Sequence, residues 1–250
     1  MNEKYYHVDV KPQMVASKLA LGAFTGNDLL FDWASFKVPT GTWRLVGVTA
    51  IVGPAVTTAQ RKALSLEFGR NDQNGAAPDS LGVVHAAHST GFAGEHLIGN
   101  VQIAAGDYVN GIKVGFNSAT CMAEVPNVTF TPELNQQGAG VTNGFETYYV
   151  AGIATGTVNF KSTVFCTGSV AATQKVVGSL DDGSGSTADI LKKFRLGDII
   201  HNADDEVVGT IASLDSATQF TCVDNVAVAQ VNNDELVNVT PITLRLTFEC

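Results

Sequence analysis

The chain has 250 residues, of which 45% are hydrophobic and 16% charged, and its formal net charge is −9. This hydrophobic content excludes an intrinsically disordered chain, and the acidic balance argues against a protein that coats nucleic acid, because such binding needs clustered positive charge. The first residues have no apolar core, so they do not form a secretory signal. No stretch reaches the roughly 20 apolar residues of a membrane-spanning helix, and we therefore expect a soluble chain that is made in a cytoplasm.

Apolar and polar residues alternate with a period of two through much of the chain. Expected strands with this pattern cover 63–68, 157–160, 162–165 and 242–248. In the last of these, Ile242, Leu244 and Leu246 point to one side and Arg245 to the other, as in an antiparallel strand with one wet face. Glycine-containing dipeptides at 74–75, 99–100, 110–111, 143–144 and 182–183 predict turns. Because sustained helical periodicity is nearly absent, the sequence predicts an all-β sandwich or barrel.

One segment near the C-terminal third departs from this alternation. Ser186 and Asp189 have the spacing of a capping box, which predicts a helix of two turns at most over 190–194, ended by Gly197. Strands are expected next over 198–201, 207–211 and 219–223, with turns at 202–206 and 215–218. About 60 residues, from Lys175 to Val237, therefore form a unit of short strands.

These patterns predict two modules. We expect a jelly-roll-like β-sandwich over residues 1–172, completed by a final strand at 241–250, and a small β-barrel over 173–240 inserted before that strand. The Gly- and Ser-rich stretch 178–186 is either a linker or a hairpin loop. The cysteines are scattered without a CxxC pair, so we interpret them as free, mostly buried thiols rather than a disulfide framework. They are Cys121, Cys166, Cys222 and Cys250.

Three histidines form the first candidate site. His85, His88 and His96 follow an H-x2-H-x7-H spacing, but a zinc site needs three or four converging ligands and no cysteine lies near them in the sequence. We therefore favour histidines in loops, some of them titrating at an interface. We expect no metal and no other cofactor.

Acidic residues give two weaker candidates for a Ca²⁺ site. Asp204, Asp205 and Glu206 are consecutive, and on a turn their oxygens are suitable ligands for this ion. The stretch 70–75, Arg-Asn-Asp-Gln-Asn-Gly, lacks the alternating ligands and the closing glutamate of an EF-hand loop. Solvated turns are the more common use of both patterns.

Enzymatic motifs are missing from the sequence. There is no G-x-S-x-G elbow, no phosphate-binding G-x-x-x-x-G-K-[ST] loop and no dinucleotide-binding glycine pattern. We therefore expect no catalytic residues and a protein that is not an enzyme. Phe31-Asp32-Trp33 and Tyr148-Tyr149 are candidates for a carbohydrate-stacking surface, although aromatic residues are more often used in a core or an interface.

Two regions resemble virion proteins of tailed phages, especially those of marine and cyanobacterial hosts. The first contains Phe31-Asp32-Trp33-Ala34-Ser35-Phe36-Lys37-Val38-Pro39-Thr40-Gly41, Arg44 to Thr49, and Tyr148 to Ala154. The second runs from Lys175 to Val223 and includes Phe194 to Ile200 and Val208 to Gln219; it is similar to a small β-barrel module that recurs in phage structural proteins. Residues 85–145 show no such resemblance.

The resemblance implies a virion structural protein, most often a capsid decoration or cement protein that binds the major capsid protein across neighbouring subunits. It also implies a position on the outer surface of the capsid, and a trimer would fit the local threefold axes of a shell. A tail, fibre or receptor-binding component that contacts host glycans is the alternative, with Trp33, Tyr148 and Tyr149 as stacking platforms. Neither role involves nucleic acid or a membrane as partner.

Overall fold

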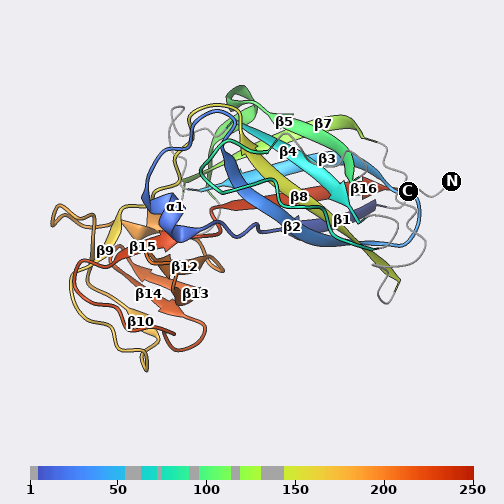
Figure 1. The fold of residues 1–250 in the computed structure, drawn as a ribbon. Helices are drawn as coiled ribbons and strands as arrows, with labels where there is room; N and C mark the ends of the chain where they lie inside the picture. The colour runs from blue at the N-terminus through green and yellow to red at the C-terminus, as the bar shows by residue number, and fades with distance from the viewer. Residues whose placement is uncertain (1–4, 54–62, 72–74, 90–95, 114–118, 131–143) are drawn as a thin grey trace.

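The computed structural model describes residues 5–53, 63–71, 75–89, 96–113, 119–130 and 144–250 (Figure 1). Its regular structure is almost entirely β-strand, arranged in three antiparallel sheets, so the predicted all-β fold is confirmed. Two sheets form a sandwich, and the third forms a smaller body beside one end of it. No helix in the described ranges is long and apolar enough to cross a membrane.

The sandwich consists of a five-stranded and a four-stranded sheet. The first has the order β1 (Tyr5–Val10), β16 (Ile242–Glu249), β3 (Arg44–Val52), β7 (Ala119–Phe130) and β6 (Tyr108–Lys113). The second has the order β2 (Leu29–Pro39), β8 (Phe145–Ala154), β4 (Leu64–Arg70) and β5 (Leu97–Ile103).

This strand order is that of a jelly roll. When β6 is set aside as an added edge strand, the remaining strands number one to eight along the chain, with β16 as the eighth. The two sheets then read one-eight-three-six and two-seven-four-five, so all consecutive strands except four and five cross between the sheets, as in a double Greek key. We call the nine strands of these two sheets, β6 included, the jelly roll; their connections belong to it, apart from the third sheet, which is inserted between β8 and β16.

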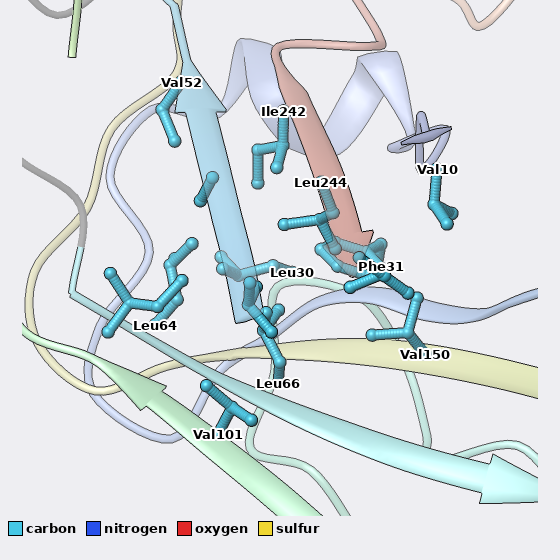
Figure 2. Packing of buried hydrophobic residues seen from close by; sticks show 14 of the residues in the cluster. Val10, Leu30, Phe31, Val52, Leu64, Leu66, Val101, Val150, Ile242 and Leu244 are labelled. Carbon is cyan, nitrogen blue, oxygen red and sulfur yellow. The ribbon is translucent and has the colours of Figure 1, made fainter. Parts of the chain in front are cut away.

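Inward-facing residues of the two sheets fill the space between them. Figure 2 shows Val52, Ile242 and Leu244 of the five-stranded sheet facing Leu64 and Leu66 of the other. The alternation predicted for the last strand is confirmed: Ile242, Leu244 and Leu246 are fully buried while Arg245 is exposed. The hydrophobic alternation of each strand is therefore what fixes which face turns inward.

The third sheet is built from short strands between the seventh and eighth strands of the jelly roll. Its order is β10 (Val176–Val177), β14 (Gln219–Cys222), β13 (Val207–Ser216), β12 (Ile199–Asn202), β15 (Glu235–Asn238), β9 (Val164–Cys166) and β11 (Leu180–Asp181). The two strands at the ends of this order, β10 and β11, are separated in sequence by residues 178–179 alone. This short connection brings the two edges of the sheet close together, so the sheet is curled; we call this body, residues 164–236, the barrel module.

The barrel module has a hydrophobic core of its own. Phe194 and Phe220 are fully buried there and meet edge to face, with ring centroids 6.0 Å apart. The sheet of the module already includes β9, so it begins ahead of residue 173. Val237 lies in β15 and Val239 follows it, but both pack in the jelly-roll core. The two cores therefore meet at the crossover from β15 to β16.

Several local predictions are wrong because tertiary pairing overrides short-range preference. Residues 99–100 and 110–111 lie within β5 and β6 rather than in turns, and the expected strand at 157–160 is reduced to one bridge between Phe24 and Val158. Asp189 caps no helix with its side chain and has φ of 50°; a single 3-10 turn, η3 (Ile190–Lys192), follows it. The stretch 178–186 contains β11 and a turn that Gly183 closes at φ of 82°. The turn glycine Gly75 has φ of 85°, whereas Asn74 and Asn143 lie outside the described residues.

Candidate functional site

A network of polar side chains lies where the barrel module meets the jelly roll. On the jelly-roll side it comprises residues 11–20, which include the short helix α1 (Ala16–Ala20), together with Gly53, 161–163 and the crossover 238–241. On the module side it comprises 195–206 and 235–236, and we call the two sides together the junction. In Figure 1, α1 lies beside β12 and β15 of the module, and it contacts both strands. The other end of the jelly roll carries Cys250.

Backbone hydrogen bonds tie the crossover to both bodies. Met14 N donates to Val239 O at 2.7 Å and Gly53 N donates to Pro241 O at 2.9 Å, both from the jelly roll. Val239 N in turn donates to Ile199 O of the barrel module at 3.0 Å. Because these bonds use the main chain, the position of the crossover is fixed from two sides.

A buried carboxylate lies at the centre of the junction. Asp198 is 1% exposed, and its Oδ2 accepts hydrogen bonds from Arg195 N at 2.8 Å and from Asn238 Nδ2 at 2.6 Å. Asn238 Oδ1 accepts from Thr240 N at 2.9 Å, and Thr240 Oγ1 accepts from Ile199 N at 2.9 Å. The network therefore links the loop before β12 to the crossover through side chains that are themselves buried.

Burial dominates the electrostatics of this carboxyl group. Loss of hydration raises the pKa of Asp198 to about 6, against the opposing effects of Arg195, Lys11 and the hydrogen bonds that it accepts. Because this native pKa lies above the value of an exposed aspartate, the folded protein binds the proton more tightly than the unfolded chain. Stability therefore decreases as the pH rises from about 4 to about 6.

A second contact joins α1 to the acidic turn after β12. Asp205 Oδ1 accepts a hydrogen bond from Ser17 N at 3.0 Å, and Asp205 itself has φ of 67°. Its carbonyl oxygen lies 3.0 Å from His201 Nδ1, so this nitrogen is the donor, and His201 Nε2 accepts from Gln13 Nε2 at 3.3 Å. Gln13, Met14 and Val15 line a depression of about 500 Å³ here together with His201 and Asp205.

A third contact comes from the segment that leads into the barrel module. Lys161 Nζ donates to Ala20 O at 2.8 Å and lies 3.3 Å from Glu235 Oε2. Ser162 Oγ donates to Leu236 O at 3.0 Å. The module therefore contacts the entry segment, α1 and the crossover, so it is attached to the jelly roll at three places rather than through a single linker.

The three candidate histidines are used separately. His85 Nε2 lies 3.1 Å from Ala23 O and its ring packs against Phe24, His88 Nδ1 lies 3.1 Å from Asn27 O, and His96 Nδ1 lies 3.0 Å from Arg70 O. Each ring therefore donates to a carbonyl of a neighbouring segment. No group of three metal-binding side chains occurs in the described ranges.

The acidic turn is organised by an asparagine. Asn202 Oδ1 accepts hydrogen bonds from Asp204 N at 3.1 Å and Glu206 N at 3.0 Å, while Asn202 Nδ2 donates to Glu206 Oε2 at 2.8 Å. The carboxylate of Glu206 is therefore engaged in the turn, and that of Asp205 is engaged with α1. In the stretch 70–75, residues 72–74 lie outside the described residues.

The candidate stacking aromatics do not form an open platform. Phe31 and Tyr148 are buried in the core, and Tyr148 Oη donates to Glu146. Trp33 is half-buried against the segment that covers the outer face of the four-stranded sheet, and its Nε1 donates to Asp79 O at 2.8 Å. Tyr149 is half-buried, which raises its pKa.

Two of the predicted free thiols are buried in the barrel module. Burial raises the pKa of Cys166 to about 12 and that of Cys222 to about 11, which makes both poor nucleophiles. Cys250 is free and exposed, and the side chain of Cys121 lies outside the description.

Sequence reasoning missed the residues that form the junction. Arg195, Asp198, Asn238 and Thr240 match no motif, and the contacts that join the first pair to the second pair are distant in sequence. One signal was present: Asp198 directly precedes an apolar strand, where a buried carboxylate needs nearby donors.

Net charge is unevenly divided between the two bodies. The barrel module contains eleven Asp and Glu against four Lys and Arg, so it carries −7 of the chain's net charge of −9. Of the large exposed apolar residues, five lie in the module: Val176, Leu196, Val207, Val223 and Val231. The barrel is therefore the more acidic body and bears most of the exposed large apolar side chains in the described ranges.

Comparison with known proteins adds little. No protein-family model and no curated protein matches the sequence. Among solved structures, the chain aligns with a structure of infectious bursal disease virus, Gx strain, at 10% identity and a TM-score of 0.17. The alignment covers 100% of this chain and 41% of that one. At this TM-score the alignment carries no argument about fold or function.

Proposed function

We propose that this chain is a non-enzymatic virion structural protein of a tailed phage, and that it decorates the outer surface of the capsid. In this role it binds the major capsid protein across neighbouring subunits and stabilises the shell through buried area. The observation that carries the proposal is the junction, which couples a jelly roll and a barrel module through three sets of contacts.

Rigid coupling is what a cementing protein needs. A protein resists the separation of two neighbouring subunits only if its own two contact surfaces cannot move apart freely. An interface of standard size buries about 1,200–2,000 Å². In this proposal the jelly roll forms one such interface and the barrel module forms another. A flexible tether between them would transmit little force, whereas a junction with buried side chains transmits it directly.

Composition supports the same role. Charged residues make up 16% of the chain, and the cores of protein interfaces are depleted in lysine and glutamate. The acidic barrel module fits a position outside the shell, away from packaged DNA, since like charges repel. A trimer on the local threefold axes remains part of the proposal.

The alternative of a glycan-binding tail or fibre component has less support. Its stacking platform needs exposed aromatic faces, but Tyr148 is buried and Trp33 packs against its own chain. No contact among the described residues favours this alternative over decoration.

The decisive experiment compares phage particles with and without this chain. We expect labelled protein in many copies over the head, and particles that lack it to release DNA at a lower temperature, with purified protein restoring the difference. The purified chain should have three times its monomer mass of 26.2 kDa in solution. Labelling of a few copies at the tail, or unchanged particle stability after deletion, would contradict the proposal.

A further inference from the structure

One side chain of the barrel module reaches across the junction to two segments of the jelly-roll side. Arg195 Nη2 donates to Thr240 O at 3.3 Å and to Pro241 O at 3.1 Å. A carbon atom added at Gly53 would stand 3.5 Å from Arg195 Nε, so the guanidinium also covers the end of β3. Its Nε lies 3.6 Å from Asp198 Oδ1. The guanidinium is therefore placed between the crossover carbonyls and the buried carboxyl group.

The carboxyl group itself is unevenly satisfied. Oδ2 of Asp198 accepts two hydrogen bonds, whereas the buried Oδ1 has no hydrogen-bond donor among the described residues. An ionised carboxylate needs donors for both oxygens when it is buried, whereas a protonated carboxyl group carries no charge and loses less when one oxygen has no donor. The closed junction thus fits the neutral form of Asp198 better than the charged form.

We infer that Arg195 and Asp198 form a proton-linked clasp, which holds the barrel module against the jelly roll more tightly in mild acid than at neutral pH. When the junction opens, the crossover moves away from Arg195 and Asp198, and water reaches both carboxylate oxygens. Arg195 then loses its contacts with the carbonyls of Thr240 and Pro241. The inference concerns the junction alone and does not depend on the proposed capsid role.

The charged groups around Asp198 set the direction of the effect. Arg195 faces it from the loop before β12, and Lys11, whose Nζ lies 3.4 Å from Gly197 O, acts from the segment after β1. Both stabilise the ionised form. The crossover contributes only the neutral side chains of Asn238 and Thr240. Burial outweighs the two cations and raises the pKa to about 6, so the closed form takes up a proton that the hydrated, open form releases.

Hydrogen exchange at the junction tests the clasp. The amides of Met14, Gly53, Ile199 and Val239 each donate across or within the junction. After correction for intrinsic exchange rates, we expect their protection to fall by about 10- to 30-fold between pH 4.5 and pH 7.5, from the difference of about two pKa units. A weak dependence on urea identifies this exchange as opening of the junction rather than global unfolding.

Two variants and one direct titration decide the result. D198N should remove the pH dependence, whereas D224N, at an exposed aspartate of the same module, should keep it. The NMR signal of the Asp198 carboxyl carbon in the unmodified protein should titrate with a midpoint near 6, which needs no folded variant. A midpoint at or below 4, a flat protection profile in the unmodified protein, or an equal slope in D198N would overturn the inference.

Discussion

The jelly roll and the barrel module reach a stable all-β structure in different ways. In the jelly roll, strands of 6–12 residues pair along most of their length, as β16 does with β1 and β3. In the barrel module, most strands have two to four residues, and the longer β13 shifts register twice against β14. Long strands supply their own backbone partners, whereas short strands leave many amides to be satisfied elsewhere.

Acidic side chains supply those partners in the barrel module. Asp182 Oδ1 accepts hydrogen bonds from Ser184 N at 2.9 Å and Ser186 N at 3.2 Å, and Asp234 Oδ2 accepts from Val231 N at 2.7 Å. Asp215 accepts from three side chains, and these bonds lower its pKa. The negative charge of the module therefore arises in part from acidic residues that stabilise turns. An acidic residue of the module is for this reason not by itself evidence of a binding surface.

The substitution with the largest expected effect, F220A, tests whether the barrel module depends on its own hydrophobic core to fold. Phe220 is fully buried beside Phe194, so F220A removes a large part of a small core and should cost about 3–5 kcal/mol. Urea unfolding measures the loss. Hydrogen exchange should show the module losing protection while β3 and β16 keep theirs.

A matched control lies in the same part of the chain. V223A changes a half-exposed residue, and we expect its effect to stay within about 0.5 kcal/mol. If F220A destabilised β3 and β16 as much as the module, the two cores would unfold as one cooperative unit rather than as two.

The next effect tests the junction between the two bodies. Asn238 donates to Asp198 and accepts from Thr240 N, so N238A leaves a buried carboxylate and an amide without these partners. We expect a loss of about 3 kcal/mol, the upper part of the range for a buried polar group. Thermal unfolding of N238A and of N225A, at an exposed asparagine of the module, gives the measurement; equal midpoints would show that the network contributes nothing.

A smaller effect is expected inside the jelly roll. At Gly152 an added Cβ would stand 2.3 Å from Phe31 Cε1, so the aromatic ring occupies the space that a side chain would need. G152A should therefore cost about 1–3 kcal/mol through overpacking. At Gly106 no atom lies within 4 Å of the added carbon, and G106A serves as the control. Equal stability of the two variants in urea would mean that the sandwich interior adapts freely.

The smallest effect concerns the open face of the five-stranded sheet. Arg245 Nε and Nη2 each lie 2.8 Å from an oxygen of Asp9, and this contact lowers the pKa of Asp9. Both side chains are about half exposed, so D9N should cost only about 0.2–1 kcal/mol, and less at high salt. Because the pKa is lowered, this contribution is present above pH 4 and is lost as the pH falls further. A stability difference that persisted unchanged at pH 2 would contradict the assignment.

Alternation of apolar residues is a local signal, so the strand content and the face that each clear strand buries follow from the amino-acid sequence. Residues 242–248 and 63–68 are examples, and the run of short expected strands after Lys175 predicts a separate small unit. The jelly-roll strand order, the strand order of the third sheet and the start of the module at β9 required the pairing of distant segments. Only the tertiary structure brought Arg195 and Asp198 to Gly53 and Thr240, because a buried polar network depends on which chain segments exclude water from it, and no local pattern encodes that.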